Sequence, residues 1–218
     1  MPDKLKRTFL NVALAVLLLG LAGCIEYREE LWLNADNSGN LVFEIGLPPH
    51  TSIEEDEIGE LSIVSFCDSV PGMTVTGSGT FTEGDITWIQ VRAEFEDVLL
   101  LNQVQNQWFG RIYMENNEEN NRVFRRIITM SDTINVNNGT FGKMLKYAAL
   151  GQYSWIYTLH LPDDIHDSNA PLMRTDTLTN SITWEYNLAS LINDQKVLTC
   201  TYRHRTGFRD YLNNLFKR

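Results

Sequence analysis

Two arginines expected to face each other on a β-hairpin are the side chains of this chain best suited to bind an anion. The hairpin is predicted because residues 108–115 and 122–130 alternate apolar and polar positions on either side of a polar loop. In the expected register, Arg111 lies opposite Arg126, and aromatic rings flank both. The candidate site consists of Arg111, Arg126, Tyr113 and Phe124. Guanidinium groups framed by aromatic rings suit a carboxylate or an anionic headgroup.

The register of this hairpin is open to a second interpretation. Like charges directly opposite each other are unfavourable, and a shift by one residue sends a side chain to the other face of the sheet. Alternatively, Glu94 or Glu96 on a neighbouring strand neutralises the arginines. In either case the arginines would be structural.

A run of acidic residues and one histidine is the densest polar cluster in the sequence. It consists of Asp163, Asp164, His166 and Asp167, and it could hold a metal ion or serve an envelope hydrolase. The other histidines are scattered, and no Gly-x-Ser-x-Gly or Cys-x-x-Cys pattern supports catalysis. We therefore expect a solvated turn at 163–167, no enzyme, no metal and no cofactor, with the hydrolase as the alternative.

The cysteines Cys67 and Cys200 both lie in apolar segments. In an oxidising compartment such a pair is a candidate disulfide, but two buried thiols fit the sequence equally well. The spacing leaves both possibilities open, because it does not show whether the two Cα atoms approach each other.

The first 23 residues have the order of a secretory signal peptide. Basic residues open the chain, an apolar stretch runs from Val12, and small residues precede Cys24. A bilayer-spanning helix needs about 20 mostly apolar residues, which this stretch does not reach. We expect residues 1–23 to be removed.

The run Leu21-Ala22-Gly23-Cys24 resembles the lipobox of bacterial lipoproteins. The resemblance implies that the leader is cut before Cys24 and that this residue carries palmitate and further acyl chains. It thus implies a lipid anchor at the cell membrane or outer membrane, with the protein facing the periplasm or the exterior. The chain has 18 basic and 28 acidic residues, and this net charge of −10 argues against nucleic acid as a partner.

The pattern after Cys24 predicts an α+β domain over residues 24–206. Alternating segments predict hairpins at 25–47 and 73–96 besides the arginine hairpin, with later strands at 153–161, 182–186 and 196–203. Helical spacing predicts helices at 53–66, 98–107 and 139–150. We expect an antiparallel sheet built from hairpins, with a few helices packed on one side.

Residues 207–218 predict an amphipathic helix with a basic polar face. Its apolar positions are Phe208, Tyr211, Leu212, Leu215 and Phe216. Such a helix either packs on the sheet or lies in a membrane interface, and the sequence supports both interpretations equally.

The segment from Pro162 through Asn169 to Trp184 resembles a signature of LppM-like bacterial lipoproteins, although Asp163 stands where that family has glycine. The resemblance implies an envelope domain that begins at the lipidated cysteine and has no established catalysis. We expect Trp184 to lie in the core and Asn169 in a turn. The sequence as a whole predicts a noncatalytic lipoprotein that binds a lipid, a glycolipid or an envelope protein.

Overall fold

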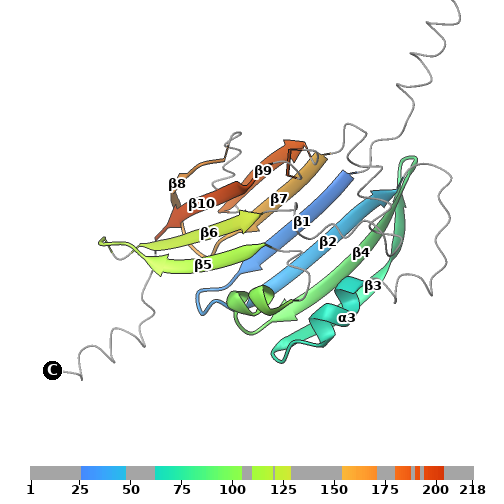
Figure 1. Ribbon diagram of the computed structural model, residues 1–218, viewed down its shortest axis with the longest axis horizontal. Coiled ribbons are helices and arrows are strands. Elements are labelled where there is room, and N and C mark those ends of the chain that lie inside the picture. The colour runs from blue at the N-terminus through green and yellow to red at the C-terminus, as the bar shows by residue number, and fades with distance from the viewer. Residues whose placement is uncertain are drawn as a thin grey trace, which may run out of the picture.

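Within the residues that the computed structural model describes, ten β-strands form two sheets (Figure 1). The structure describes residues 26–47, 62–104, 110–119, 121–128, 154–170, 180–187, 190–191 and 194–203. The strands at 26–33, 154–160 and 196–202 follow the alternation of the sequence, with one side mostly buried and the other partly exposed.

The larger sheet has six strands in the order β3-β4-β2-β1-β7-β9. Their bounds are β1 Glu26–Leu33, β2 Gly39–Leu47, β3 Met73–Glu83, β4 Ile86–Phe95, β7 Ser154–His160 and β9 Ser181–Asn187. All neighbours are antiparallel except β1 and β7, which run parallel. The long connection between β1 and β7 allows this parallel pair, which a short hairpin turn could not make.

The smaller sheet has four antiparallel strands in the order β5-β6-β10-β8. Their bounds are β5 Arg111–Asn116, β6 Arg122–Ile128, β8 Ile165–Ser168 and β10 Lys196–Tyr202. Its buried side meets the inner face of the larger sheet where β6 lies against β1 and β7, as contacts between Arg126 and residues of both strands show.

The core lies between these two faces. Large side chains that are completely enclosed include Trp155, Tyr157, Trp184, Phe124 and Leu31. Each large apolar side chain of this kind stabilises the fold by about 1.5–3 kcal/mol. Stacked rings run from Trp155 to Tyr157 and from Tyr157 to Trp184, with centroid separations of 5.6 Å at both steps.

The turn between β1 and β2 shows how the local sequence fixes a hairpin. Asp36 accepts hydrogen bonds from the backbone and hydroxyl of Ser38, and Asn37 has a φ of 71°. Asn tolerates this left-handed conformation better than most residues. A Cβ atom on Gly39 would lie 1.9 Å from the Trp32 carbonyl oxygen, so only glycine fits the start of β2.

The expected α+β class is wrong, because the described residues hold two β-sheets and very little helix. Helix α3 covers Ser62–Asp68, at the end of the helix expected at 53–66. The helix expected at 98–107 is a 3-10 helix, η1, at Val98–Gln103. Its buried residues Val98 and Leu101 are three apart, which is one turn of a 3-10 helix. The segment 139–150 lies outside the described residues.

A second sheet takes the place that we expected helices to fill. A strand with one apolar face needs a cover, and either helices or another sheet can provide it. Here the hairpin of β5 and β6 turns its apolar face toward β1 and β7, and β10 and β8 extend that cover. Strand β8 lies in the segment that we predicted to be a solvated turn.

Candidate functional site

A buried ion pair joins the two sheets. Alternation along β1 places Glu29 on the same inner face as Tyr27 and Leu31, and alternation along β6 places Arg126 between buried apolar residues. Arg126 donates from Nη1 to Glu29 Oε1 at 2.7 Å and from Nη2 to Oε2 at 3.0 Å. Each side chain is only 1% exposed. This bidentate geometry is the strongest arrangement that an arginine and a carboxylate can adopt.

Aromatic rings surround this pair. The guanidinium carbon of Arg126 lies 4.5 Å from the ring centre of Tyr157 and 5.5 Å from that of Trp155. The Tyr157 hydroxyl is buried and makes no hydrogen bond within the described part of the chain. The rings thus replace water on the faces of the guanidinium that Glu29 does not contact.

The charges of the pair depend on each other. Burial raises the pKa of the Glu29 carboxyl, and the nearby Arg126 opposes that shift. Burial also disfavours the charged form of Arg126, but Glu29, together with Tyr157 and Tyr27, outweighs burial and raises the arginine pKa. Because an arginine stays protonated in proteins, a neutral Glu29 would leave an unpaired buried cation. The pair is therefore ionised in the folded protein.

The predicted anion site is divided between two faces of the small sheet. The register is shifted by one residue from the expected one, so Arg111 pairs with Ile127, and Ile112 pairs with Arg126. Arg111 is exposed on the outer face, whereas Arg126 is buried.

The aromatic residues of that site follow the same division. Tyr113 lies on the outer face, 5.6 Å from the Arg125 guanidinium, and Arg125 also pairs with Glu115 at 2.8 Å. Phe124 lies on the inner face and is completely buried. A ligand at the surface can therefore reach Arg111 and Tyr113, whereas the fold encloses the other two residues.

The acidic and histidine segment does not converge on one point. Asp163 is 8% exposed, while His166 and Asp167 are exposed on successive positions of β8. Successive residues of a strand point to opposite faces. Among the described residues, no group of three or more His, Cys, Asp or Glu side chains could hold a metal ion.

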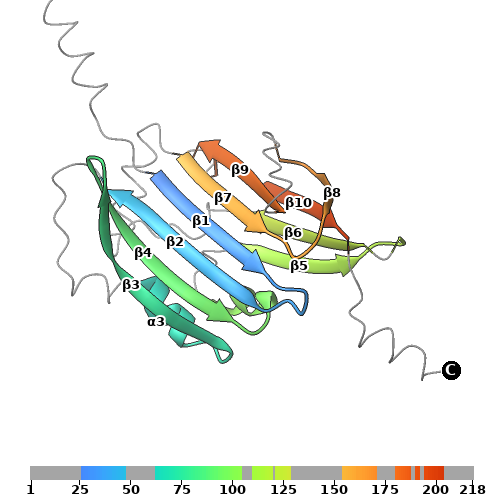
Figure 2. The same cartoon turned by 180° about the vertical axis from the view of Figure 1, so that it is seen from behind.

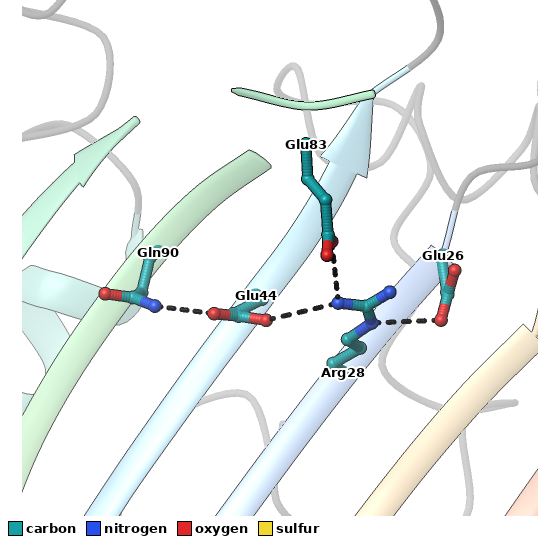
Figure 3. A network of polar contacts seen from close by, with 5 residues as sticks. All are labelled: Glu26, Arg28, Glu44, Glu83 and Gln90. Carbon is teal, nitrogen blue, oxygen red and sulfur yellow. Dashed lines mark hydrogen bonds and ion pairs between the residues drawn. The ribbon is translucent and has the colours of Figure 1, made fainter. Parts of the chain in front are cut away.

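A polar network crosses the outer face of the large sheet (Figure 3). Arg28 on β1 donates to Glu26 at 3.0 Å and to Glu83 at the end of β3 at 3.2 Å, and it lies 4.0 Å from Glu44 on β2. Glu44 in turn accepts a hydrogen bond of 2.5 Å from Gln90 on β4. These contacts connect side chains from four neighbouring strands.

The same face has an open groove beside the network, which we call the β3 groove. It has a volume of about 510 Å³ and is lined by Thr76, Gly77, Ser78, Gly79, Thr80, Phe81, Gln90 and Arg92. The Arg92 Nε donates to Gln90 Oε1 at 2.6 Å, which links one wall of the groove to the network. Phe81 is 38% exposed and stacks on the buried Trp88.

The residues of the sequence signature have structural roles. Trp184 is completely buried, and its Nε1 donates to Asn169 Oδ1 at 3.2 Å. Asn169 also accepts from the Thr199 backbone and donates to the Val197 carbonyl oxygen. Asn169 therefore connects β9 of the large sheet to β10 of the small one.

The two candidate disulfide residues are free and buried thiols in the structure. Cys67 lies on α3 and Cys200 on β10, and these two elements lie at opposite ends of the molecule (Figures 1 and 2). Burial raises their pKa values to about 11 for Cys67 and about 12 for Cys200. Both thiols therefore stay protonated at neutral pH.

The two predicted membrane contacts lie outside the described residues, which begin at Glu26 and end at Arg203. Cys24 precedes this range, and the apolar positions of 208–216 follow it. Among the helices that the structure describes, none has the length and apolar character needed to cross a bilayer.

Comparison with solved structures finds a domain of similar fold. It is the folded domain of LppM from Mycobacterium tuberculosis, determined by NMR. The match has a TM-score of 0.48 and 9% sequence identity, and it covers 86% of this chain and 94% of that domain. No protein-family model matches the sequence, and no curated protein matches it either. The lipobox and the sequence signature therefore stay predictions.

Sequence reasoning missed Glu29 and the β3 groove. Glu29 occupies an inward position of the alternating segment that begins the domain, so the alternation itself places a carboxylate among apolar residues. Gly77 and Gly79 alternate with hydroxyl residues, and this pattern removes side chains from one face of β3. Both signals are local and readable in the sequence.

Proposed function

We propose that this chain is a noncatalytic, lipid-anchored protein of the bacterial envelope that binds a partner through its β-sheet domain. The proposal is carried by the position of Cys24, at the end of a lipobox and two residues before the start of β1. A fully extended residue spans about 3.3–3.6 Å, so Glu26 stays within about 7 Å of the acylated residue. Several acyl chains on Cys24 would give stable attachment.

A second membrane contact, through residues 207–218, would also fix the orientation of the domain relative to the bilayer. Strand β10 ends beside β6, because Tyr202 pairs with Arg122, and Arg122 donates to Asn37 in the turn that follows β1. The described chain thus ends at the end of the sheet opposite to Glu26 (Figures 1 and 2). If both Cys24 and the C-terminal helix contact the bilayer, the strands run along its surface.

A binding role is favoured over catalysis by the chemistry of the described surfaces. The side chains at 163–167 point in different directions, which counts against the envelope hydrolase. The β3 groove offers hydroxyls, an amide, a guanidinium and a partly exposed aromatic ring. These are groups that recognise a polar partner such as a glycolipid headgroup or a protein segment.

The anchor is tested with the full chain expressed in a bacterium that is fed an alkyne-tagged palmitate. We expect the tag on the wild-type chain and its loss in Cys24→Ser, because only the acylated cysteine would carry it. Cys67→Ser is the matched control, and it should label like the wild type because that thiol is buried and protonated. Equal labelling of wild type and Cys24→Ser, or no labelling of either, would contradict the proposal.

A further inference from the structure

We propose that the free edge of β3 pairs with β3 of a second copy of this chain, antiparallel and centred on Ser78. Strand β3 is the first strand in the order of the large sheet, so only β4 pairs with it within the described part of the chain. No described strand pairs with its outer edge, and a free strand edge is a template for another strand.

The sequence at this edge is self-complementary. Residues Thr76-Gly77-Ser78-Gly79-Thr80 read the same in both directions. In an antiparallel pair about a twofold axis at Ser78, Thr76 lies opposite Thr80 and Ser78 lies opposite its own copy. Identical surfaces that match about a twofold axis define an isologous interface, and paired Thr side chains stabilise adjacent strands. A heterologous partner would gain nothing from this symmetry.

Charge supports a copy of the chain as the occupant. Residues 69–82 contain no Asp, Glu, Lys or Arg, although the whole chain has 46 such residues among 218. Natural edge strands are commonly protected by charge, especially lysine. Two copies with a net charge of −10 repel each other elsewhere, so an uncharged edge is where they can approach.

The described residues leave this edge open along the segment that would pair. The N–H of Val75 donates to the side chain of Asp68, the last residue of α3, so the first part of β3 is occupied. Beyond it, Thr76, Ser78 and Thr80 are exposed. A Cβ atom on Gly77 or Gly79 would meet no described atom within 4 Å, so the described residues leave this face of the strand uncovered as well. The bulge between Val75 and Gly77 limits the match to Thr76–Thr80.

The pairing agrees with the proposed membrane attachment, and in this respect it rests on the proposed function. An antiparallel pair places the Glu26 ends of the two copies at opposite ends of the joined sheet. Both copies then reach one bilayer only when their strands run along it, which is the orientation that contacts at Cys24 and 207–218 would impose. Attachment to one membrane also raises the effective concentration of the copies, and this favours a short interface.

Disulfide trapping tests the pairing in the full chain, expressed with its leader and oxidised in intact membranes. Directly opposite residues of antiparallel strands have Cα atoms about 4.5–5.5 Å apart, which lies within the range of a disulfide. We expect Ser78→Cys to form a covalent dimer. The unsubstituted chain gives the baseline, because Cys67 and Cys200 are buried.

The register is tested by two further substitutions. Thr76→Cys and Thr80→Cys should each fail to crosslink alone, because identical positions would lie about 13 Å apart along the strand, four residues at about 3.3 Å. Coexpressed, the two variants should form the mixed dimer. Thr82→Cys, exposed on the same strand, should stay at the baseline because its copy would be eight residues away. Equal crosslinking at Ser78 and Thr82, or none at Ser78, would overturn the proposal.

A lysine substitution at the β3 edge distinguishes specific strand pairing from random collision of the copies. Ser78→Lys in the coexpressed Thr76→Cys and Thr80→Cys chains should reduce the mixed dimer to the Thr82→Cys level. Glu118→Lys, a larger charge change in the exposed β5–β6 turn, should leave it intact. Repeating the Ser78→Cys experiment in a Cys24→Ser chain at high concentration tests the edge without the anchor. Dimers of this chain, together with no palmitate label on the wild-type chain, would contradict the anchor alone. A labelled wild-type chain, together with no dimers of the Cys24→Ser chain, would contradict the pairing alone.

Discussion

Glu29 of β1 and Arg126 of β6 hold the two sheets together through two parallel hydrogen bonds, with neither side chain more than 1% exposed. The residues are 97 positions apart in the sequence, and each stands at an inward position of an otherwise apolar strand face. Removing two charges from water is costly, and the bidentate contact offsets that cost only while both partners are present. The pair therefore specifies how β6 sits on β1 and β7.

Loss of one partner of this pair should be much worse than loss of both. Glu29→Met or Arg126→Met alone should lower the free energy of unfolding by about 3–5 kcal/mol, because a buried charge is left unpaired. The double variant should recover most of that loss, since two methionines fill the space without charge. Urea denaturation of the Cys24→Ser chain and its variants measures this. Additive effects of the two substitutions would show that the side chains do not depend on each other.

Asn169 should contribute to stability in spite of its exposed position. Its side chain accepts from Trp184 Nε1 and Thr199 N and donates to the Val197 carbonyl oxygen. Asn169→Ala leaves the buried indole N–H unpaired, so we expect a loss of about 1–3 kcal/mol by urea denaturation. His166→Ala, an exposed change three residues earlier, should cost less than about 0.5 kcal/mol. Similar losses in the two variants would show that this hydrogen-bond cluster is not important for stability.

Local alternation of the sequence was sufficient to find most strands, because most of them have one buried side. The segment at 25–33 became β1, and the turn with Asp36 and Ser38 is the expected hairpin turn. Strand β8 was not predicted from alternation. His166 and Asp167 look like loop residues, and they join a strand only because β10 supplies the partner.

The pairing of distant strands could not be predicted from local patterns. The parallel contact of β1 with β7 joins residue 26 to residue 154, and no periodicity encodes it. The register of the arginine hairpin failed for a related reason. Arg126 turns inward because Glu29, far away in the sequence, can neutralise it, and this placed Arg111 on the opposite face.

The stability of the fold should decrease in alkaline solution, because two buried thiols resist losing their protons in the folded protein. In the folded protein burial raises their pKa values from 9.0 to about 11 for Cys67 and about 12 for Cys200. Above pH 9 the unfolded chain therefore loses these protons more readily than the folded one, so the free energy of unfolding decreases between about pH 9 and 12. Urea denaturation at several pH values measures this, and Cys67→Ala with Cys200→Ala should reduce the decrease.

The same thiols should be unreactive in the folded protein. At pH 8 a thiol with a pKa near 11 is thiolate in only about one molecule in a thousand, and the thiolate is the species that reacts. A thiol reagent should thus modify Cys67 and Cys200 slowly in buffer and rapidly in urea. Rapid modification of the folded protein would contradict the burial of these residues.

The C-terminal apolar positions should retain part of the membrane association when the acyl anchor is removed. In a Cys24→Ser chain, a helix with Phe208, Leu212 and Leu215 on one side can still insert into the interface of a bilayer. Leu212→Glu places a charge on that apolar side and should lower the fraction that floats with vesicles, whereas Asn213→Glu adds the same charge on the polar side and should change it less. Because electrostatic attraction would respond to both substitutions alike, the difference between them reports apolar insertion. Equal flotation of the two variants would instead favour a helix that packs on the sheet.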